Sequence, residues 1–220
     1  MSEYGNDSTN EELERINRLQ REVFDAMVDV FEPPYPPGVP ERLKRIVAAG
    51  AIQPGETVLD VGSGPGTLIP MIRAQGPGRI IACDLSQKMM ERNRTHNPDI
   101  EPHLSDVSTL DLPDGILDVV YINACFSNIA DKASALDNVH RMMNSGGRLL
   151  ISHPMGRAFV LDLIERAPFP LDPLPGKEEA EGLLAGHGFQ LLSYVDEPLL
   201  FLVSALRTSG AAEQGTASND

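Results

Sequence analysis

The sequence contains few residues of the types that build disulfide, metal or nucleic-acid sites. Among its 220 residues there are two cysteines, Cys83 and Cys125, no tryptophan and 5% aromatic residues. The cysteines form no C-x-x-C pair and adjoin no cluster of histidines, so the pattern supports neither a disulfide framework nor a structural zinc site. We therefore expect no metal cofactor, and the low use of cysteine favours a reducing, cytoplasmic environment.

Positive charge is also scarce. Lysine and arginine number 18 against 32 aspartates and glutamates, which gives a net charge of −14. Nucleic acids and anionic membranes bind through clustered positive charge, and no apolar run reaches the about 18 residues of a membrane-spanning helix. The polar, acidic start of the chain does not resemble a targeting peptide. We expect neither nucleic acid nor a membrane as a partner, and the sequence indicates no oligomeric state.

The remaining composition is that of a globular domain. With 41% hydrophobic residues, a chain of this length is expected to bury roughly 70% of its unfolded surface in one core. Residues 1–8 and 208–220 are small and polar, which predicts disordered tails. Residues 9–50 predict an N-terminal helical lid and connector, because a capping pattern begins at Thr9 and a proline-rich segment follows the helix. Residues 51–207 then form the main domain.

The main domain alternates short apolar runs with helical patterns. Strands are expected in GGRLLISH and, before it, at residues 57–61, 80–84, 100–104 and 117–123. Helices are expected between them, the first from Thr67 to Ala74, and this alternation predicts an α/β fold with a mostly parallel sheet. The last segment, FQLLSYVDEPLLFLVSALR, contains two apolar strands joined only by Asp196, Glu197 and Pro198. So short a connection excludes a helical crossover, and the final pair must be antiparallel.

The first of these strands ends in the stretch VLDVGSGPG, which carries the strongest functional pattern. Asp60 lies near the end of the strand, and Gly62, Gly64 and Gly66 follow at alternate positions. Glycines at such a turn let ligand atoms approach the main chain, and open α/β sheets bind ligands beyond the carboxyl ends of their strands. Dinucleotide binding requires G-x-G-x-x-G, and an acid beside a pyrophosphate would repel it. The pattern favours a ligand with an ammonium or sulfonium group.

VLDVGSGPG resembles motif I of the class I S-adenosylmethionine-dependent methyltransferases, and the resemblance extends over residues 41–207. It implies a Rossmann-like, seven-stranded sheet in the order 3-2-1-4-5-7-6, with strand 7 antiparallel and helices on both faces. Asp84, in IIACDLS, resembles the acid that binds both ribose hydroxyls. Asp106 and Val107, in LSDVSTL, match the position that meets adenine. LDVVYINACF resembles motif IV. The resemblance thus implies that S-adenosylmethionine contacts Asp60, Gly62, Gly64, Gly66, Asp84, Leu85, Asp106, Val107, Asn123 and Cys125.

Methyl transfer from a sulfonium is an in-line displacement, which a protein promotes mainly by aligning the reactants and excluding water. Candidate catalytic residues should follow the fourth and fifth strands. His153 is the best-placed titratable group and is predicted to accept a proton near neutral pH; the alternative is a hydrogen bond to the loop backbone. Arg157 is predicted to bind an anionic group of the substrate, with Asp162 or solvent as the alternative partner. Cys125 is expected to pack or to contact the cofactor.

These patterns predict an enzyme that methylates a small molecule, with the acceptor atom undetermined. The N-terminal helix and connector are similar to the segment that folds over the cofactor in small-molecule methyltransferases, which would bring Phe31 and Tyr35 to the substrate. Two cysteines are too few for arsenite methylation, and the motif of magnesium-dependent catechol methylation is not evident. Two alternatives remain, a methyltransferase-like binding or scaffold protein without activity and, disfavoured by the glycine spacing, a nicotinamide-dependent oxidoreductase.

Overall fold

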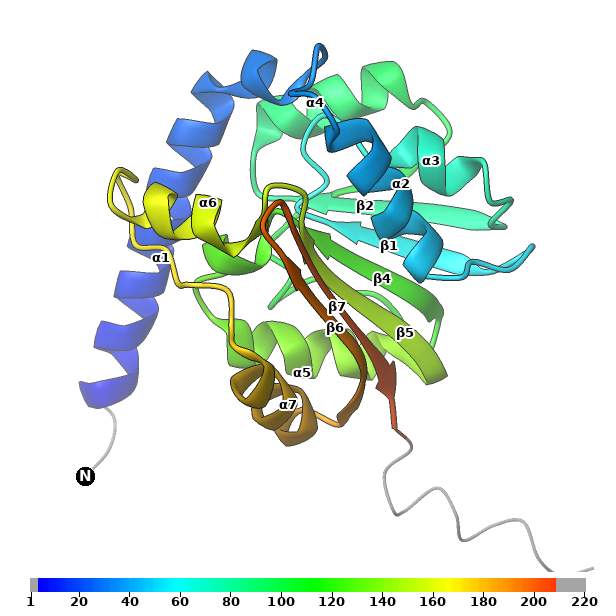
Figure 1. Ribbon diagram of the computed structural model, residues 1–220. Coiled ribbons are helices and arrows are strands. Elements are labelled where there is room, and N and C mark those ends of the chain that lie inside the picture. The colour runs from blue at the N-terminus through cyan, green and yellow to red at the C-terminus, as the bar shows by residue number, and fades with distance from the viewer. Residues whose placement is uncertain (1–3, 209–220) are drawn as a thin grey trace, which may run out of the picture.

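The computed structural model describes residues 4–208. It is built on a sheet of seven strands, which runs through the middle of the molecule (Figure 1). The strands lie in the order β3-β2-β1-β4-β5-β7-β6. Their bounds are β1 Thr57–Val61, β2 Arg79–Asp84, β3 Glu101–Leu104, β4 Leu117–Asn123, β5 Met143–His153, β6 Phe189–Glu197 and β7 Leu200–Arg207. β7 pairs antiparallel with both β5 and β6, and all other neighbours are parallel. The predicted strand order and the antiparallel final pair are confirmed.

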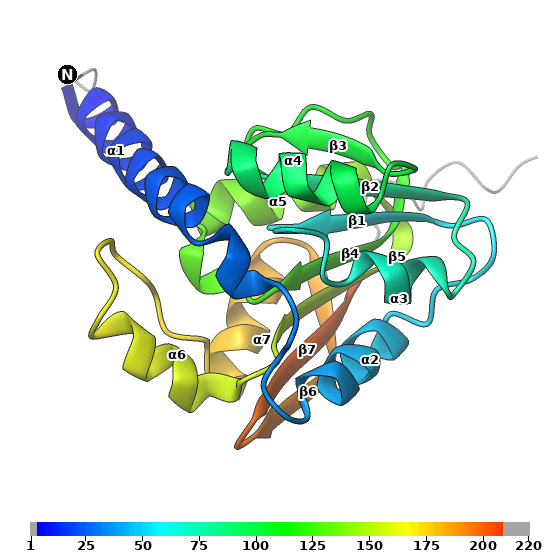
Figure 2. The ribbon, with the colours of Figure 1, turned by 90° about the horizontal axis from the view of Figure 1, so that it is seen from above.

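Helices cover both faces of this sheet (Figures 1 and 2). One face carries α2 Val39–Ala49, α3 Ile69–Arg73 and α4 Gln87–His96. The other carries α5 Lys132–Met142 and α7 Lys177–Gly186. Beyond the edge where the parallel strands end lie α1 Tyr4–Ala26 and α6 Gly156–Ile164, together with the short 3-10 helices η1 Val28–Phe31 and η2 Phe126–Asn128.

The central strands are buried on both faces because helices cover both sides of a parallel sheet. Val58 and Leu59 of β1 and Val119 and Val120 of β4 are all 0% exposed. Successive side chains of a strand point to opposite faces, so each pair contributes to two cores. Leu59 and Val120 pack with α5 and α7, whereas Val58 and Val119 pack with α2 and α3. This double burial fixes the register of the strands and thus the positions at which their carboxyl ends emerge.

Two helices begin at positions other than those predicted. α1 begins at Tyr4, five residues before Thr9, and residues 4–8 are therefore helical rather than part of a tail; no proline precedes Thr9 to stop the helix. α3 begins at Ile69 rather than at Thr67, because Gly66 has a φ of 92° and accepts a hydrogen bond from the Ile69 N–H in a separate turn. Residues 1–3 and 209–220, where the other predicted tail segments fall, lie outside the described part of the chain.

Candidate cofactor-binding site

The glycine turn between β1 and α3 forms the centre of the site. Gly62, Gly64 and Gly66 have φ angles of 61°, 54° and 92°, a region that strains residues with a side chain. A Cβ on Gly62 would come 2.3 Å from the Sγ of Cys125, and one on Gly66 would come 2.3 Å from Oδ1 of Asn93. A Cβ on Gly64, by contrast, would have no neighbour closer than 4.0 Å. The turn is therefore packed at both ends and open in the middle, where a ligand has room to approach the backbone.

Asp84, the last residue of β2, lies directly beside this open part of the turn. Its Oδ2 accepts a hydrogen bond from the Gly64 N–H, and its Oδ1 accepts one from the Ser86 N–H, each at 2.8 Å. Burial raises the pKa of Asp84, while these backbone donors act in the opposite direction. A carboxylate has about four acceptor positions, so Asp84 retains capacity for ligand hydroxyl groups.

Asp60 is the most unusual group at the turn. It is 1% exposed, and its Oδ2 has no hydrogen-bond partner among the described residues. Burial, and then the charge of Asp84, raise the pKa of Asp60 to about 8. Buried charges are normally paired. An unpartnered buried acid at the open glycine turn therefore fits a ligand that brings a positive charge, as S-adenosylmethionine does.

A cavity of about 640 Å³ lies between α1 and the carboxyl ends of β2 and β3. On the sheet side it is lined by Leu85, Ser105 and Asp106. On the other side it is closed by α1, whose Asn17 and Arg21 are among the lining residues. Two of the predicted cofactor contacts, Leu85 and Asp106, thus lie in one cavity large enough for part of a nucleoside.

The sequence did not reveal how α1 docks on this edge of the sheet (Figure 2). Asn17 Nδ2 donates to Asp106 Oδ2 at 2.7 Å, and Gln20 Nε2 donates to the carbonyl of Asn128 at 2.7 Å. Gln20 is 2% exposed although it is polar. The only local signal for these contacts is that the polar residues interrupt one face of an otherwise apolar helical stripe.

The end of α1 makes a third contact, with the start of α4. Asp25 Oδ1 accepts hydrogen bonds from Ser86 Oγ at 2.5 Å and from the Lys88 N–H at 3.1 Å. An acid at this place is favoured because the N-terminus of a helix carries partial positive charge. Asp25 also adds to the negative charge that raises the pKa of Asp84, so α1 brings a further acid to the site.

The connector after α1 reaches the glycine turn. The Tyr35 hydroxyl lies 3.5 Å from the hydroxyl of Thr67, which in turn lies 3.5 Å from the carbonyl oxygen of Phe31. Phe31 and Tyr35, predicted to be near the substrate, are therefore placed against the turn.

The remaining predicted cofactor contacts lie at the ends of β3 and β4. Val107 is 4% exposed and packs in the core. Asn123 Oδ1 accepts a hydrogen bond from Ser152 Oγ at 3.0 Å, which joins β4 to β5. Cys125 is half-buried against Gly62, and burial raises the pKa of its thiol. A thiol with a raised pKa is a poor nucleophile at neutral pH.

His153 and Arg157 follow β5, as predicted, but both have protein partners. His153 is 8% exposed, and its Nδ1 accepts a hydrogen bond from the Met155 N–H at 3.2 Å. Burial lowers the pKa of His153 to about 4, so the ring is neutral at pH 7 with its proton on Nε2. Arg157 donates to Asp196 of β6 at 3.0 Å, whereas its expected alternative partner, Asp162, pairs with another arginine.

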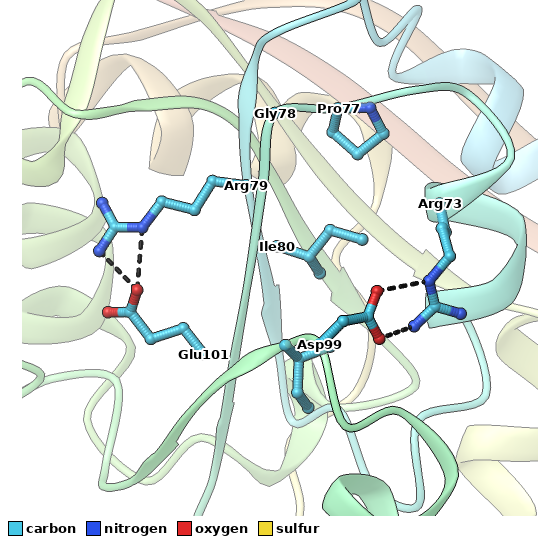
Figure 3. A pocket seen from close by; sticks show the side chains of 8 residues that line it. Arg73, Pro77, Gly78, Arg79, Ile80, Asp99 and Glu101 are labelled. Carbon is cyan, nitrogen blue, oxygen red and sulfur yellow. Dashed lines mark hydrogen bonds and ion pairs between the residues drawn. The ribbon is translucent and has the colours of Figure 1, made fainter.

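A smaller hollow of about 260 Å³ lies at the opposite edge of the sheet, where β2 and β3 begin (Figure 3). There Arg73 pairs with Asp99 and Arg79 pairs with Glu101. Each arginine in this hollow has a carboxylate partner. We therefore assign the cofactor site to the carboxyl ends of the strands. Within residues 4–208, no group of three or more His, Cys, Asp or Glu side chains is arranged to hold a metal. No helix in that range is long and apolar enough to cross a membrane.

The sheet order, the glycine turn after β1 and the acids at the ends of β2 and β3 define a class I methyltransferase fold. Residues 59–151 match the family model described as a methyltransferase domain. Within the matched residues, this confirms the resemblance to the class I S-adenosylmethionine-dependent methyltransferases that the sequence indicated. This match disfavours the nicotinamide-dependent alternative.

Similar proteins cover parts of the chain. An uncharacterized 37.1 kDa protein in transposon Tn4556 of Streptomyces fradiae is 41% identical over 115 residues, 50% of this chain and 33% of that protein. Arsenite methyltransferase of Halobacterium salinarum is 33% identical over 148 residues, 63% of this chain and 35% of that protein. The chain thus spans about a third of the length of these two relatives.

Among solved structures, one similar chain belongs to the complex between the Haloferax volcanii Trm112 methyltransferase activator and a methyltransferase. Its TM-score is 0.72 at 17% identity, and the match covers 84% of this chain and 98% of that one. At this identity the likeness supports the fold alone.

Proposed function

We propose that this protein transfers a methyl group from S-adenosylmethionine to a small-molecule acceptor. The observation that carries the proposal is the pair of acids at the glycine turn, the buried Asp60 with an unpartnered oxygen and the half-buried Asp84 hydrogen-bonded to Gly64. Bound S-adenosylmethionine supplies a methyl group on a positively charged sulfur. The residues of the site would hold the cofactor and the acceptor in line and exclude water.

Each part of the cofactor has a partner of matching chemistry at the site. Asp60 would pair with the ammonium of its amino-acid part, which offsets the cost of burying that acid. Asp84 would accept hydrogen bonds from the ribose hydroxyls, and Leu85 would pack against the adenine ring. Asp106 and the Val107 N–H would bind the amino group and the edge of that ring. Gly62, Gly64 and Gly66 let the backbone approach the ligand, and Asn123 and Cys125 border the methyl group.

His153 and Arg157 remain the candidates for handling the acceptor. His153 is neutral near pH 7. Its Nδ1 can accept a proton from the substrate once the hydrogen bond from the Met155 N–H is broken. Arg157 binds an anionic substrate group only if that group displaces Asp196. Both roles therefore require the substrate to replace a contact within the protein.

Calorimetry with S-adenosylmethionine and S-adenosylhomocysteine tests the cofactor site. Asp84→Asn removes the charged acceptor, and we expect it to weaken both ligands by about tenfold to a hundredfold, the range for hydrogen bonds to a charged group. Glu101→Gln is the matched control, because Glu101 lies at the amino end of the neighbouring strand and pairs with Arg79. Absence of binding by the wild type, or equal binding by Asp84→Asn, would overturn the proposal.

A further inference from the structure

Asn17 of α1 makes one hydrogen bond and leaves one polar atom without a partner. Its Nδ2 donates to Asp106 Oδ2 at 2.7 Å, across 89 positions of sequence. Carboxylate oxygens accept hydrogen bonds, so the amide nitrogen must face Asp106 and the amide oxygen must point elsewhere. That oxygen, Oδ1, is buried and has no hydrogen-bond partner within residues 4–208. Buried polar atoms are rarely left unpaired, which suggests that a ligand supplies the missing donor.

The cavity beside α1 is where that ligand would lie. Asn17 and Asp106 both line it, together with Leu85. Asp106 Oδ1 is already engaged by the backbone N–H and the hydroxyl of Ser108, each at 2.8 Å. Asn17 and Asp106 therefore bring two hydrogen-bond acceptors close together at the wall of the cavity, Asp106 Oδ2 and the buried oxygen of Asn17.

We propose that Asn17 recognises the adenine ring jointly with Asp106, an inference that rests on the proposed function for the position of that ring. The exocyclic amino group of adenine has two N–H donors. One donates to Asp106 Oδ2, and the second donates to Asn17 Oδ1, which gains the partner it lacks. α1 thus supplies a specificity-determining residue from outside the domain that carries the glycine turn.

Because Asp106 and Asn17 both present hydrogen-bond acceptors, the site should prefer a purine with an amino group over one with an oxo group at the same position. A hypoxanthine ring places a carbonyl oxygen where adenine has its amino group, so it would oppose an acceptor with an acceptor at both Asp106 and Asn17. A site built to bond an amino group rejects a ligand that lacks it, because its own polar groups are then left unpaired. Loss of Asn17 should therefore weaken the adenine ligand and leave the hypoxanthine ligand little changed.

α1 is held in place by contacts other than Asn17. Gln20 donates to the carbonyl of Asn128, and Asp25 accepts from Ser86. The helix therefore has two further attachments to the site when Asn17 is replaced. Replacing Asn17 therefore tests ligand recognition without removing the other contacts that dock the helix.

The test compares the dissociation constants of S-adenosylhomocysteine and of its 6-oxo analogue, S-inosylhomocysteine, by calorimetry. For Asn17→Ala we expect S-adenosylhomocysteine to bind about tenfold more weakly, with the analogue little affected, so that the preference for the amino purine falls by the same factor. Asn10→Ala, which replaces an exposed asparagine of the same helix, is the matched control and should change neither value.

Each other outcome overturns part of the account. Equal weakening of both ligands would show that Asn17 only docks α1, and unchanged binding of both would show that it has no role. Asn17→Ser serves as a second variant if the alanine form does not fold. A wild-type protein that binds neither ligand would overturn the proposed function itself, whereas wild-type binding with an unchanged preference in the variants overturns the role of Asn17 alone.

Discussion

Gly62 and Cys125 are packed so closely that a Cβ on Gly62 would lie 2.3 Å from the Cys125 Sγ. Gly62 follows β1 and Cys125 follows β4, and these strands are neighbours in the sheet. The contact therefore closes the space between two central strands at their carboxyl ends. It leaves no room for a side chain at position 62.

Gly62→Ala should destabilise the protein through two separate effects. The positive φ of 61° costs about 1–2 kcal/mol for a residue with a Cβ, and the clash with Cys125 adds about 1–3 kcal/mol of overpacking. Gly76→Ala is the matched control, because Gly76 has a φ of 78° but nothing within 4 Å of a Cβ. Urea unfolding should show a clearly larger loss for Gly62→Ala, partly restored by adding Cys125→Ala. Equal losses at positions 62 and 76 would refute the packing argument.

Asp60 should make the stability depend on pH in an unusual direction. Its pKa in the folded protein is raised to about 8 from an ordinary value of 3.8, so the folded state binds more protons than the unfolded state between these limits. The stability that Asp60 contributes is fully present below pH 4 and is lost as the pH rises through 8. Asp60→Asn should therefore gain stability relative to the wild type as the pH is raised from 5 to 9.

The control for this experiment is Asp99→Asn. The hydrogen bond from Arg73 lowers the pKa of Asp99, so its contribution changes only in the acid range and should be constant between pH 5 and 9. Chemical unfolding at several pH values measures both differences. A difference between Asp60→Asn and the wild type that does not vary with pH would contradict the assignment.

Asn93 holds the glycine turn to α4. It is 0% exposed, its Nδ2 donates to Ser63 Oγ at 3.1 Å, and its Oδ1 accepts from Asn97 Nδ2 at 3.0 Å. Asn93→Ala leaves a buried donor and acceptor unpaired, so we expect a loss of about 1–3 kcal/mol in the free energy of unfolding. Thr95→Ala, at an exposed position of the same helix, should cost much less. Similar losses for the two variants in urea unfolding would show that the buried network is unimportant.

His153 should remain neutral well below the pH at which histidine normally charges. Its pKa is lowered to about 4, so the unfolded state binds the extra proton between pH 4 and about 6.5. The stability due to His153 is thus present above this range and is lost as the pH falls through it. Nitrogen-15 NMR of the ring at pH 6 should show the Nε2–H form. A charged ring at that pH, or a proton on Nδ1, would contradict the burial and the hydrogen bond from Met155.

Local patterns in the sequence were sufficient for most of the fold. Alternating apolar runs and helical stripes located the strands, and the short link at Asp196–Pro198 required the antiparallel end of the sheet. The sequence also placed Asp60, Asp84 and the glycines at one site. They lie at the carboxyl ends of neighbouring parallel strands, and these ends lie on the same side of the sheet. The order of the strands came from the resemblance, since periodicity alone does not specify which strands are neighbours.

The periodicity of apolar residues does not predict contacts between distant parts of the chain. Asn17 meets Asp106 across 89 positions, and Gln20 meets Asn128 across 108. A helical stripe shows which face of α1 is buried but not what covers it. Likewise, Arg157 pairs with Asp196, 39 positions away, rather than with the nearby Asp162. The unpartnered oxygens of Asp60 and Asn17 are visible only once all neighbours are in place.

The decisive measurement is a crystal structure of the protein with S-adenosylhomocysteine. We expect the ligand to lie between α1 and the carboxyl ends of the strands, with its ammonium at Asp60, its ribose hydroxyls on Asp84 and its adenine at Asp106. Ligand density elsewhere, such as the hollow of Arg73 and Arg79 at the opposite edge of the sheet, would contradict it.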